Sequence, residues 1–247
     1  MIVEHEEDIA GLKAIGHICA GTLRTMMEAV QPGMTTMELD EIGREVLDKA
    51  GANSAPVSLY KFPGITCISV SPVIAHGIPS DHVLREGQLI NIDVSAEMNG
   101  YFGDTGASMV VAMHVPEYEK IIAAAKSALE KAVQVARTGQ TINSIGKAVQ
   151  GVARRNGYGV IYDLTGHGIG RHLHEEPVQV FNHFKPRDRY VLKEGLVLAI
   201  EPFLTTGKGH VVEEADGWSL RTTDRTIAAQ FEHTIIVTKD EPIILTI

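Results

Sequence analysis

An internal repeat constrains the fold of this 247-residue chain more than any other feature of its sequence. Residues recur unchanged at an offset of 106, where Ile15, Leu23, Gly33, Thr35, Val46 and Gly51 are matched by Ile121, Leu129, Gly139, Thr141, Val152 and Gly157. The copies cover roughly residues 7–111 and 113–240. Two copies are too few for a solenoid, so the repeat predicts one α/β domain over residues 1–247, with pseudo-twofold halves that share a curved sheet.

Each half is expected to begin with two helices. Residues 7–30 place apolar side chains at helical spacing, and a second run follows Thr36, an expected N-cap, and ends at Gly51. The same pattern returns at 116–136 and 142–156. The repeat therefore extends to secondary structure.

The two halves also supply matching polar residues. Leu84-Arg-Glu-Gly recurs as Leu192-Lys-Glu-Gly, and Ile92-Asp93 recurs as Ile200-Glu201, both at an offset of 108. Each half also contains one HxxP element. A looser correspondence adds an acidic residue before a β-rich run in each copy. The resulting pairs are Asp93 with Glu201, His76 with His174, and Asp104 with Glu232. We therefore expect a site built between the halves.

Composition excludes several classes of protein. With 22 basic and 31 acidic residues the formal net charge is −9, which lacks the basic excess that nucleic acid attracts. The amino terminus is acidic, unlike a secretory signal, and no apolar run is long enough to span a membrane. Cys19 and Cys67 lie outside any CxxC motif, so neither a disulfide framework nor a zinc ribbon is expected. We expect a cytoplasmic protein.

The paired acids predict a metal site. Strand alternation places Asp93 opposite Ile92 and Val94, so that it faces a polar pocket. A single such acid is more often a solvated strand edge, but four at related positions favour a site. Four buried carboxylates need compensating positive charge, and two divalent cations balance them where one would not. His167, between glycines in residues 166–170, is the candidate fifth ligand, with a buried core histidine as the alternative.

Competing motifs match less well. The segment after His174 superficially resembles HExxH, but Pro177 breaks a helix and position 178 is valine. Residues 166–170 read GxGxG and lack the helix start of a dinucleotide loop. Asp104-Thr-Gly resembles an aspartic protease loop, of which two copies are needed. An aspartic-type protease that uses Asp104 in a homodimer, and a non-catalytic binding protein of the same fold, remain as alternatives.

Over essentially the whole chain, the sequence resembles the type I methionine aminopeptidases of the pita-bread metallopeptidase fold. The resemblance rests on seven segments in the family's order: Ala75–Pro79, Asn91–Val94, Gly103–Thr105, Thr165–Gly170, His174–Pro177, Ile200–Pro202 and Gln230–Thr234. It implies a pita-bread fold in which a curved antiparallel sheet is covered by helices. It also implies removal of the initiator methionine from nascent polypeptides, with preference for a small second residue.

The resemblance assigns roles to individual residues. It implies two divalent metal ions, of Co, Mn, Fe or Zn, held by Asp93, Asp104, His167, Glu201 and Glu232. A water that bridges both ions would attack the scissile carbonyl, with Glu201 as general base. His174 would donate a hydrogen bond to the developing oxyanion, and His76 would hold the second substrate residue or assist proton transfer.

The resemblance also implies a methionine pocket and a set of partners. The pocket would be lined by Leu59, Phe62, Cys67, Leu173 and Trp218, an apolar set suited to a thioether. Relatives often carry Tyr or His at the positions of Leu59 and Tyr60, and many carry Asn at Ser71, near a monovalent-cation site. We expect a monomer that meets the N-terminal methionine of nascent peptides near the ribosome exit, without membrane or direct nucleic-acid binding.

Overall fold

A computed structural model describes the whole chain, residues 1–247. Its helices are α1 (Glu6–Ala29), α2 (Thr36–Ala50), α3 (Ala55–Tyr60), α4 (Pro116–Val135) and α5 (Asn143–Arg155). Its first-half strands are β1 (Asn53–Ser54), β2 (Cys67–Val70), β3 (Val73–Ala75), β4 (Leu89–Met98) and β5 (Tyr101–Val110). The remaining strands are β6 (Gly159–Val160), β7 (Thr165–Gly168), β8 (Glu175–Phe181), β9 (Val197–Ile200), β10 (Phe203–Thr205), β11 (Val211–Glu213), β12 (Leu220–Thr222), β13 (Ala228–Gln230), β14 (His233–Ile236) and β15 (Ile243–Ile244).

The four long helices lie where the apolar spacing predicts them, to within one residue at each end. The cap of α2 differs from the expectation. The hydroxyl of Thr35, rather than that of Thr36, accepts a hydrogen bond from the backbone N–H of Glu38, and the Glu38 carboxylate accepts one from Thr35 N in return. This reciprocal capping box needs its acid three residues after the cap, which Thr35 has and Thr36 lacks.

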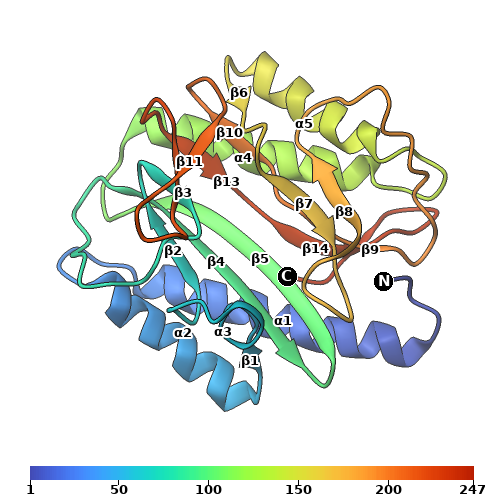
Figure 1. Cartoon of the computed structure of the whole chain (residues 1–247), viewed down its shortest axis with the longest axis horizontal. Helices are drawn as coiled ribbons and strands as arrows, with labels where there is room; N and C mark the ends of the chain where they lie inside the picture. The colour runs from blue at the N-terminus through green and yellow to red at the C-terminus, as the bar shows by residue number, and fades with distance from the viewer.

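Matching hydrogen bonds relate the two halves. Gly33 N donates to Leu84 O at 2.9 Å in the first half, and Gly139 N donates to Leu192 O at 2.9 Å in the second. In Figure 1, α1 and α2 lie beside β4 and β5 in the lower half of the view, and α4 and α5 lie in the upper half. The strands occupy the space between the two helical pairs, as a pseudo-twofold arrangement requires.

All paired strands are antiparallel, and they meet at the boundary between the halves. In the first half β4 pairs with β1, β2 and β5; in the second the order is β15-β14-β9-β7-β8. An isolated bridge from Ala107 to Phe231 joins the halves, and Glu232 N donates to Gly106 O at 2.9 Å. The middle of β5 therefore lies against the segment between β13 and β14.

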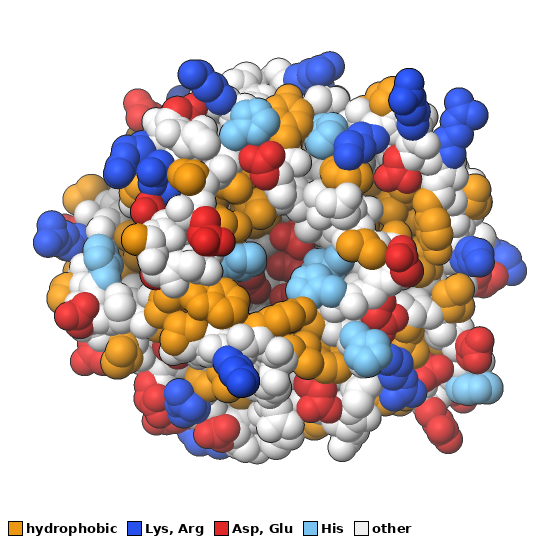
Figure 2. Space-filling view, in the orientation of Figure 1, with side chains coloured by type: hydrophobic (Ala, Val, Ile, Leu, Met, Phe, Trp, Pro, Cys, Tyr) orange, Lys and Arg blue, Asp and Glu red, His pale blue; other side chains and the backbone are white.

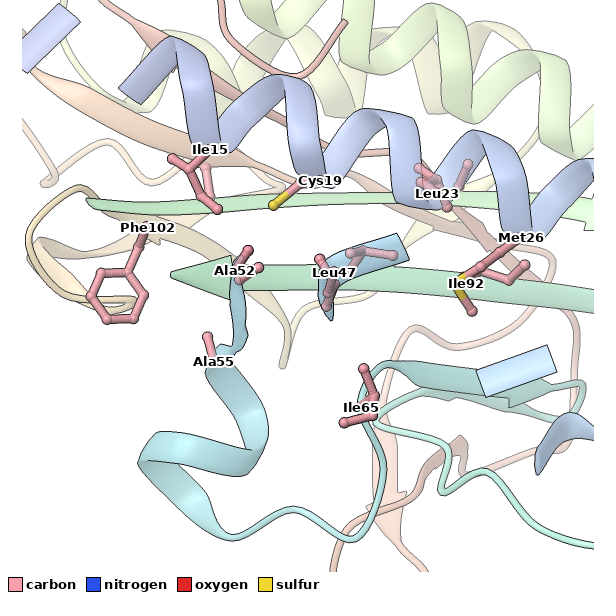
Figure 3. Packing of buried hydrophobic residues seen from close by; sticks show 14 of the residues in the cluster. Ile15, Cys19, Leu23, Met26, Leu47, Ala52, Ala55, Ile65, Ile92 and Phe102 are labelled. Atoms are coloured by element: carbon pink, nitrogen blue, oxygen red, sulfur yellow. The ribbon is translucent and has the colours of Figure 1, made fainter. Parts of the chain in front are cut away.

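Two apolar clusters stabilise the halves. One packs α1 and α2 on β4 and β5, and its buried side chains include Ile15, Leu23, Met26 and Ile92 (Figure 3). The other packs α4 and α5 on strands of the second half, around residues such as Leu198. Each helical pair buries the apolar stripe that its spacing predicts. None of the helices is both long enough and apolar enough to cross a membrane.

Candidate metal-binding site

A cavity of about 360 Å³ opens at the boundary between the halves. Figure 2 shows a hollow near the centre of this face, with acidic side chains in its depth and histidines beside it. The four acids and three histidines predicted for the site all line this cavity: Asp93, Asp104, Glu201, Glu232, His76, His167 and His174. The structure therefore brings together residues that are as far as 156 positions apart in the chain, from His76 to Glu232.

The acids occupy equivalent positions in the two halves. Asp93 and Asp104 lie on the neighbouring strands β4 and β5, whereas Glu201 follows β9 and Glu232 precedes β14. Thr105 Oγ1 donates to Glu232 O at 2.8 Å, which ties the first half to the second beside the site. Two carboxylates thus lie within strands, and the other two lie directly beside strand ends.

His167 lies in a strand rather than in a loop. It belongs to β7, which pairs with both β8 and β9. The glycines are needed because the neighbouring strands approach closely. A Cβ at Gly166 would lie only 2.3 Å from Ala199 O, and one at Gly168 only 2.4 Å from Glu176 O. Small residues here let the imidazole sit between two strands.

The spacing around His167 suits a shared cation. Its Nδ1 donates to Gly168 O at 3.0 Å, so Nε2 is left unprotonated and free to bind metal. This Nε2 lies 3.7 Å from Asp104 Oδ2 and 3.7 Å from Glu201 Oε1. Those distances exceed the ordinary hydrogen-bond range. Ligand atoms of Asp104, His167 and Glu232 all lie within 4.8 Å of one another.

Without metal, ionisation of the four buried carboxyl groups is unfavourable. Burial raises the pKa of Asp93 to about 6. Burial, and then the charges of Glu232 and Asp93, raise the pKa of Asp104 well above its usual range. The pKa of Glu201 and that of Glu232 are raised well above their usual range by burial and the neighbouring carboxylates. Such shifts are typical of a site that binds cations.

Unpaired oxygens give an independent test of the fit to metal. Asp104 Oδ1 and Glu232 Oε1 are buried and have no hydrogen-bond partner. A buried carboxylate oxygen without a partner is costly, and a coordinated cation would supply the missing interaction. Oxygen and imidazole donors are also the ligands that divalent first-row metals accept. The donor set therefore fits a metal.

Sequence reasoning missed the residues that orient Glu232. Gln230 Nε2 donates to Glu232 Oε2 at 3.0 Å, and Asn91 Nδ2 donates to Gln230 Oε1 at 2.7 Å. Strand alternation places Asn91 on the same face of β4 as Asp93, but it gives no role for the Asn91 side chain. The contact with Gln230 joins segments 139 residues apart and had no local signal.

The two remaining histidines lie on the cavity wall. His76 has a φ of 53°, a left-handed conformation that is uncommon outside glycine and is concentrated at functional sites. Burial lowers the pKa of His76, and burial followed by the charge of His76 lowers the pKa of His174. Both imidazoles are therefore neutral at pH 7. The rings of His167 and His174 have centroids 4.2 Å apart.

Apolar side chains form the wall next to the carboxylates. Phe62 and Trp218 meet edge to face with centroids 5.2 Å apart, and Cys67 and Leu173 also line the cavity. Leu59 does not line it, and its side chain is 45% exposed. Successive residues of a helix point about 100° apart, and here Tyr60, the next residue of α3, faces the cavity instead.

Comparison with known proteins gives consistent matches. Residues 10–239 match the model of metallopeptidase family M24. The chain is 48% identical to methionine aminopeptidase 2 of Bacillus subtilis (strain 168), over all of this chain and 99% of that protein. It also matches the crystal structure of methionine aminopeptidase from Rickettsia prowazekii, with TM-score 0.95, 36% identity and complete coverage of both chains.

More distant structures share the fold. The prolidase from Pyrococcus furiosus superposes with TM-score 0.81 at 23% identity, over all of this chain and 65% of that one. The pita-bread architecture implied by the sequence is therefore present.

Proposed function

Because this chain belongs to metallopeptidase family M24 and, within it, to the methionine aminopeptidases, we propose that it removes the N-terminal initiator methionine from nascent polypeptides. One observation carries the proposal. Buried carboxylate oxygens without partners, on Asp104 and Glu232, lie beside an apolar wall that suits a thioether side chain. We further propose that residues 1–247 form one catalytic domain with duplicated halves, roughly 7–111 and 113–240.

We assign the metal ligands to the residues gathered in the cavity. These are Asp93, Asp104, His167, Glu201 and Glu232, which together would hold two divalent ions of Co, Mn, Fe or Zn. Two ions balance four carboxylate charges, whereas one leaves excess negative charge in a buried site. When bound, the ions supply Lewis-acid polarisation of the peptide carbonyl and lower the pKa of water.

The chain's own residues perform the proton transfer and hold the substrate. Glu201 accepts a proton from the attacking water and passes it to the leaving amine. His174 donates a hydrogen bond to the oxygen of the scissile carbonyl as negative charge develops on it. His76, on the opposite half, holds the backbone of the second substrate residue or assists proton transfer.

The cavity also explains which substrates should be processed. The methionine side chain packs against the apolar wall formed by Phe62, Cys67, Leu173 and Trp218. The cavity of about 360 Å³ holds this side chain and the start of the next residue, and we propose that a small second residue is preferred. We propose that the enzyme acts as a monomer on chains that emerge from the ribosome.

A metal-reconstituted assay tests this function. The metal-free protein is loaded in turn with Mn, Fe, Co or Zn and supplied with Met-Ala and Met-Leu peptides. We expect free methionine from Met-Ala at a higher rate than from Met-Leu, and loss of activity with a chelator. Activity that survives the chelator would favour the aspartic-type alternative. No turnover with any metal would favour a binding protein.

A further inference from the structure

A hydrogen bond links the cavity histidine to a residue outside the predicted site. Tyr60 Oη lies 2.6 Å from His174 Nδ1, across 114 positions of the chain. The two rings have centroids 5.9 Å apart and are tilted by 56°. Both side chains line the cavity. This contact uses one of the two ring nitrogens of His174 and leaves only Nε2 for the substrate.

The length of the bond indicates which group donates. A bond of 2.6 Å is shorter than the usual range of about 2.7–3.2 Å for an N–H donor, but it lies within about 2.5–3.0 Å for an O–H donor. Burial, and then the charge of Asp104, raise the pKa of Tyr60, so the phenol keeps its proton at neutral pH. The phenol O–H therefore donates and His174 Nδ1 accepts.

The assignment also fixes the second ring nitrogen of His174. A neutral imidazole that accepts at Nδ1 must carry its hydrogen on Nε2. The opposite tautomer would carry its hydrogen on Nδ1 and leave the phenol hydrogen without this partner.

Local structure holds the phenol in place. Tyr60 ends α3, a short helix whose cap Ser54 accepts from Val57 N at 3.4 Å and donates to Ile65 O at 2.7 Å. Lys61 then ends the helix in a left-handed conformation, with φ of 59°. The backbone of Tyr60 is therefore held at the end of α3, although the residue is 45% exposed.

We propose that Tyr60 is a positioning residue that donates its phenol hydrogen to Nδ1 of His174 and thereby fixes the tautomer with hydrogen on Nε2. That hydrogen is the one His174 presents to the substrate carbonyl, so this inference rests on the proposed function. Removal of the phenol oxygen frees the imidazole to rotate and to exchange tautomers. The chemical step slows, while the apolar wall that binds methionine is unchanged.

The test compares Tyr60→Phe with a matched control, Tyr162→Phe. Tyr162 is 40% exposed and lies outside the cavity lining. Nitrogen NMR of the zinc-loaded, ¹⁵N-histidine-labelled proteins, with His174→Asn used to assign the His174 signal, shows which ring nitrogen carries hydrogen. We expect Nε2–H in the wild type and in Tyr162→Phe, and a mixture of tautomers in Tyr60→Phe. We also expect kcat of Tyr60→Phe to fall by about twofold to tenfold, the effect of one hydrogen bond, with KM almost unchanged.

Other outcomes overturn the proposal. Hydrogen on Nδ1 of His174 in the wild type, or an Nε2–H signal that Tyr60→Phe leaves unaltered, would contradict the hydrogen bond itself. A tautomer mixture with undiminished kcat would contradict the positioning role. If the wild type releases no methionine, the proposed function is wrong. The NMR spectra of the same proteins would still show whether Tyr60 donates its phenol hydrogen to His174.

Discussion

The hydroxyl of Thr234 closes a two-way hydrogen bond with the backbone of Asp104. Asp104 N donates to Thr234 Oγ1 at 3.0 Å, and Thr234 Oγ1 donates to Asp104 O at 2.7 Å. Both residues are buried, and 130 positions separate them in the chain. This pair holds β5 of the first half against β14 of the second, at the point where Asp104 and Glu232 approach each other.

Thr234→Val should loosen that junction. The isosteric change leaves the buried N–H and C=O of Asp104 without their partner, at a cost of about 1–3 kcal/mol in free energy of unfolding. Residues that support metal ligands typically change metal affinity by about 10–100-fold when removed. Calorimetric metal titration and urea unfolding measure both effects. Thr234→Ser keeps the hydroxyl and is the control; equal metal affinity of the Val and wild-type proteins would contradict this role.

His167→Ala and His174→Ala should differ in their response to metal. Loss of His167 removes a ligand, so its activity should recover at least in part as Mn or Co is raised to saturation. Loss of His174 removes a donor to the oxyanion, which costs about 10²–10³ in kcat and is not restored by metal. Peptide hydrolysis across a metal titration measures both variants. Rescue of His174→Ala alone would reverse the two roles.

Asp104→Asn should abolish activity at every pH. The side chain loses the charge that, in our proposal, helps to hold the two metal ions, and no change of proton concentration can restore it. Activity measured from acidic to alkaline pH, together with metal content by elemental analysis, checks this. A variant that stays active with an optimum moved toward acid would support the aspartic-type alternative.

In the metal-free protein, the buried carboxyl groups should lower the stability as the pH rises above about 4, the ordinary carboxyl pKa. Asp104, Glu201 and Glu232 have raised pKa values, so the folded chain retains protons that the unfolded chain has already released, and stability falls through that range. Buried histidines with lowered pKa values raise the stability as the pH rises, but only up to the pKa of histidine in the unfolded chain. Urea unfolding at several pH values measures the slope. Saturating metal should abolish it; a slope identical with and without metal would contradict this origin.

The repeated pattern allowed much of the fold to be predicted from sequence. Helical spacing located the four long helices, because each needs an apolar face toward its own half. The repeat also singled out Asp93 with Glu201 as an equivalent pair, and both lie in the cavity. Both predictions rest on patterns that can be read from the sequence itself, namely the spacing of apolar residues and the internal repeat.

Residues that act across the boundary between the halves could not be predicted in the same way. Tyr60 meets His174, and Gln230 meets Asn91, only after distant segments pack together. The family resemblance implies Leu59 as a pocket residue, but the direction of its side chain depends on where α3 ends. Likewise, the glycines beside His167 reflect neighbouring strands that the local sequence does not reveal.

The division of the carboxylates between the halves has a consequence for how such an enzyme could have arisen. A half-length ancestor folded like residues 7–111 would have carried an acidic strand pair like that of Asp93 and Asp104 but no facing pair. It could have completed a metal site of this kind only by docking with a second copy of itself across the contact where Gly106 now meets Glu232. Gene fusion would then have freed the copies to diverge, so that a histidine without a counterpart, His167, could appear on one side alone.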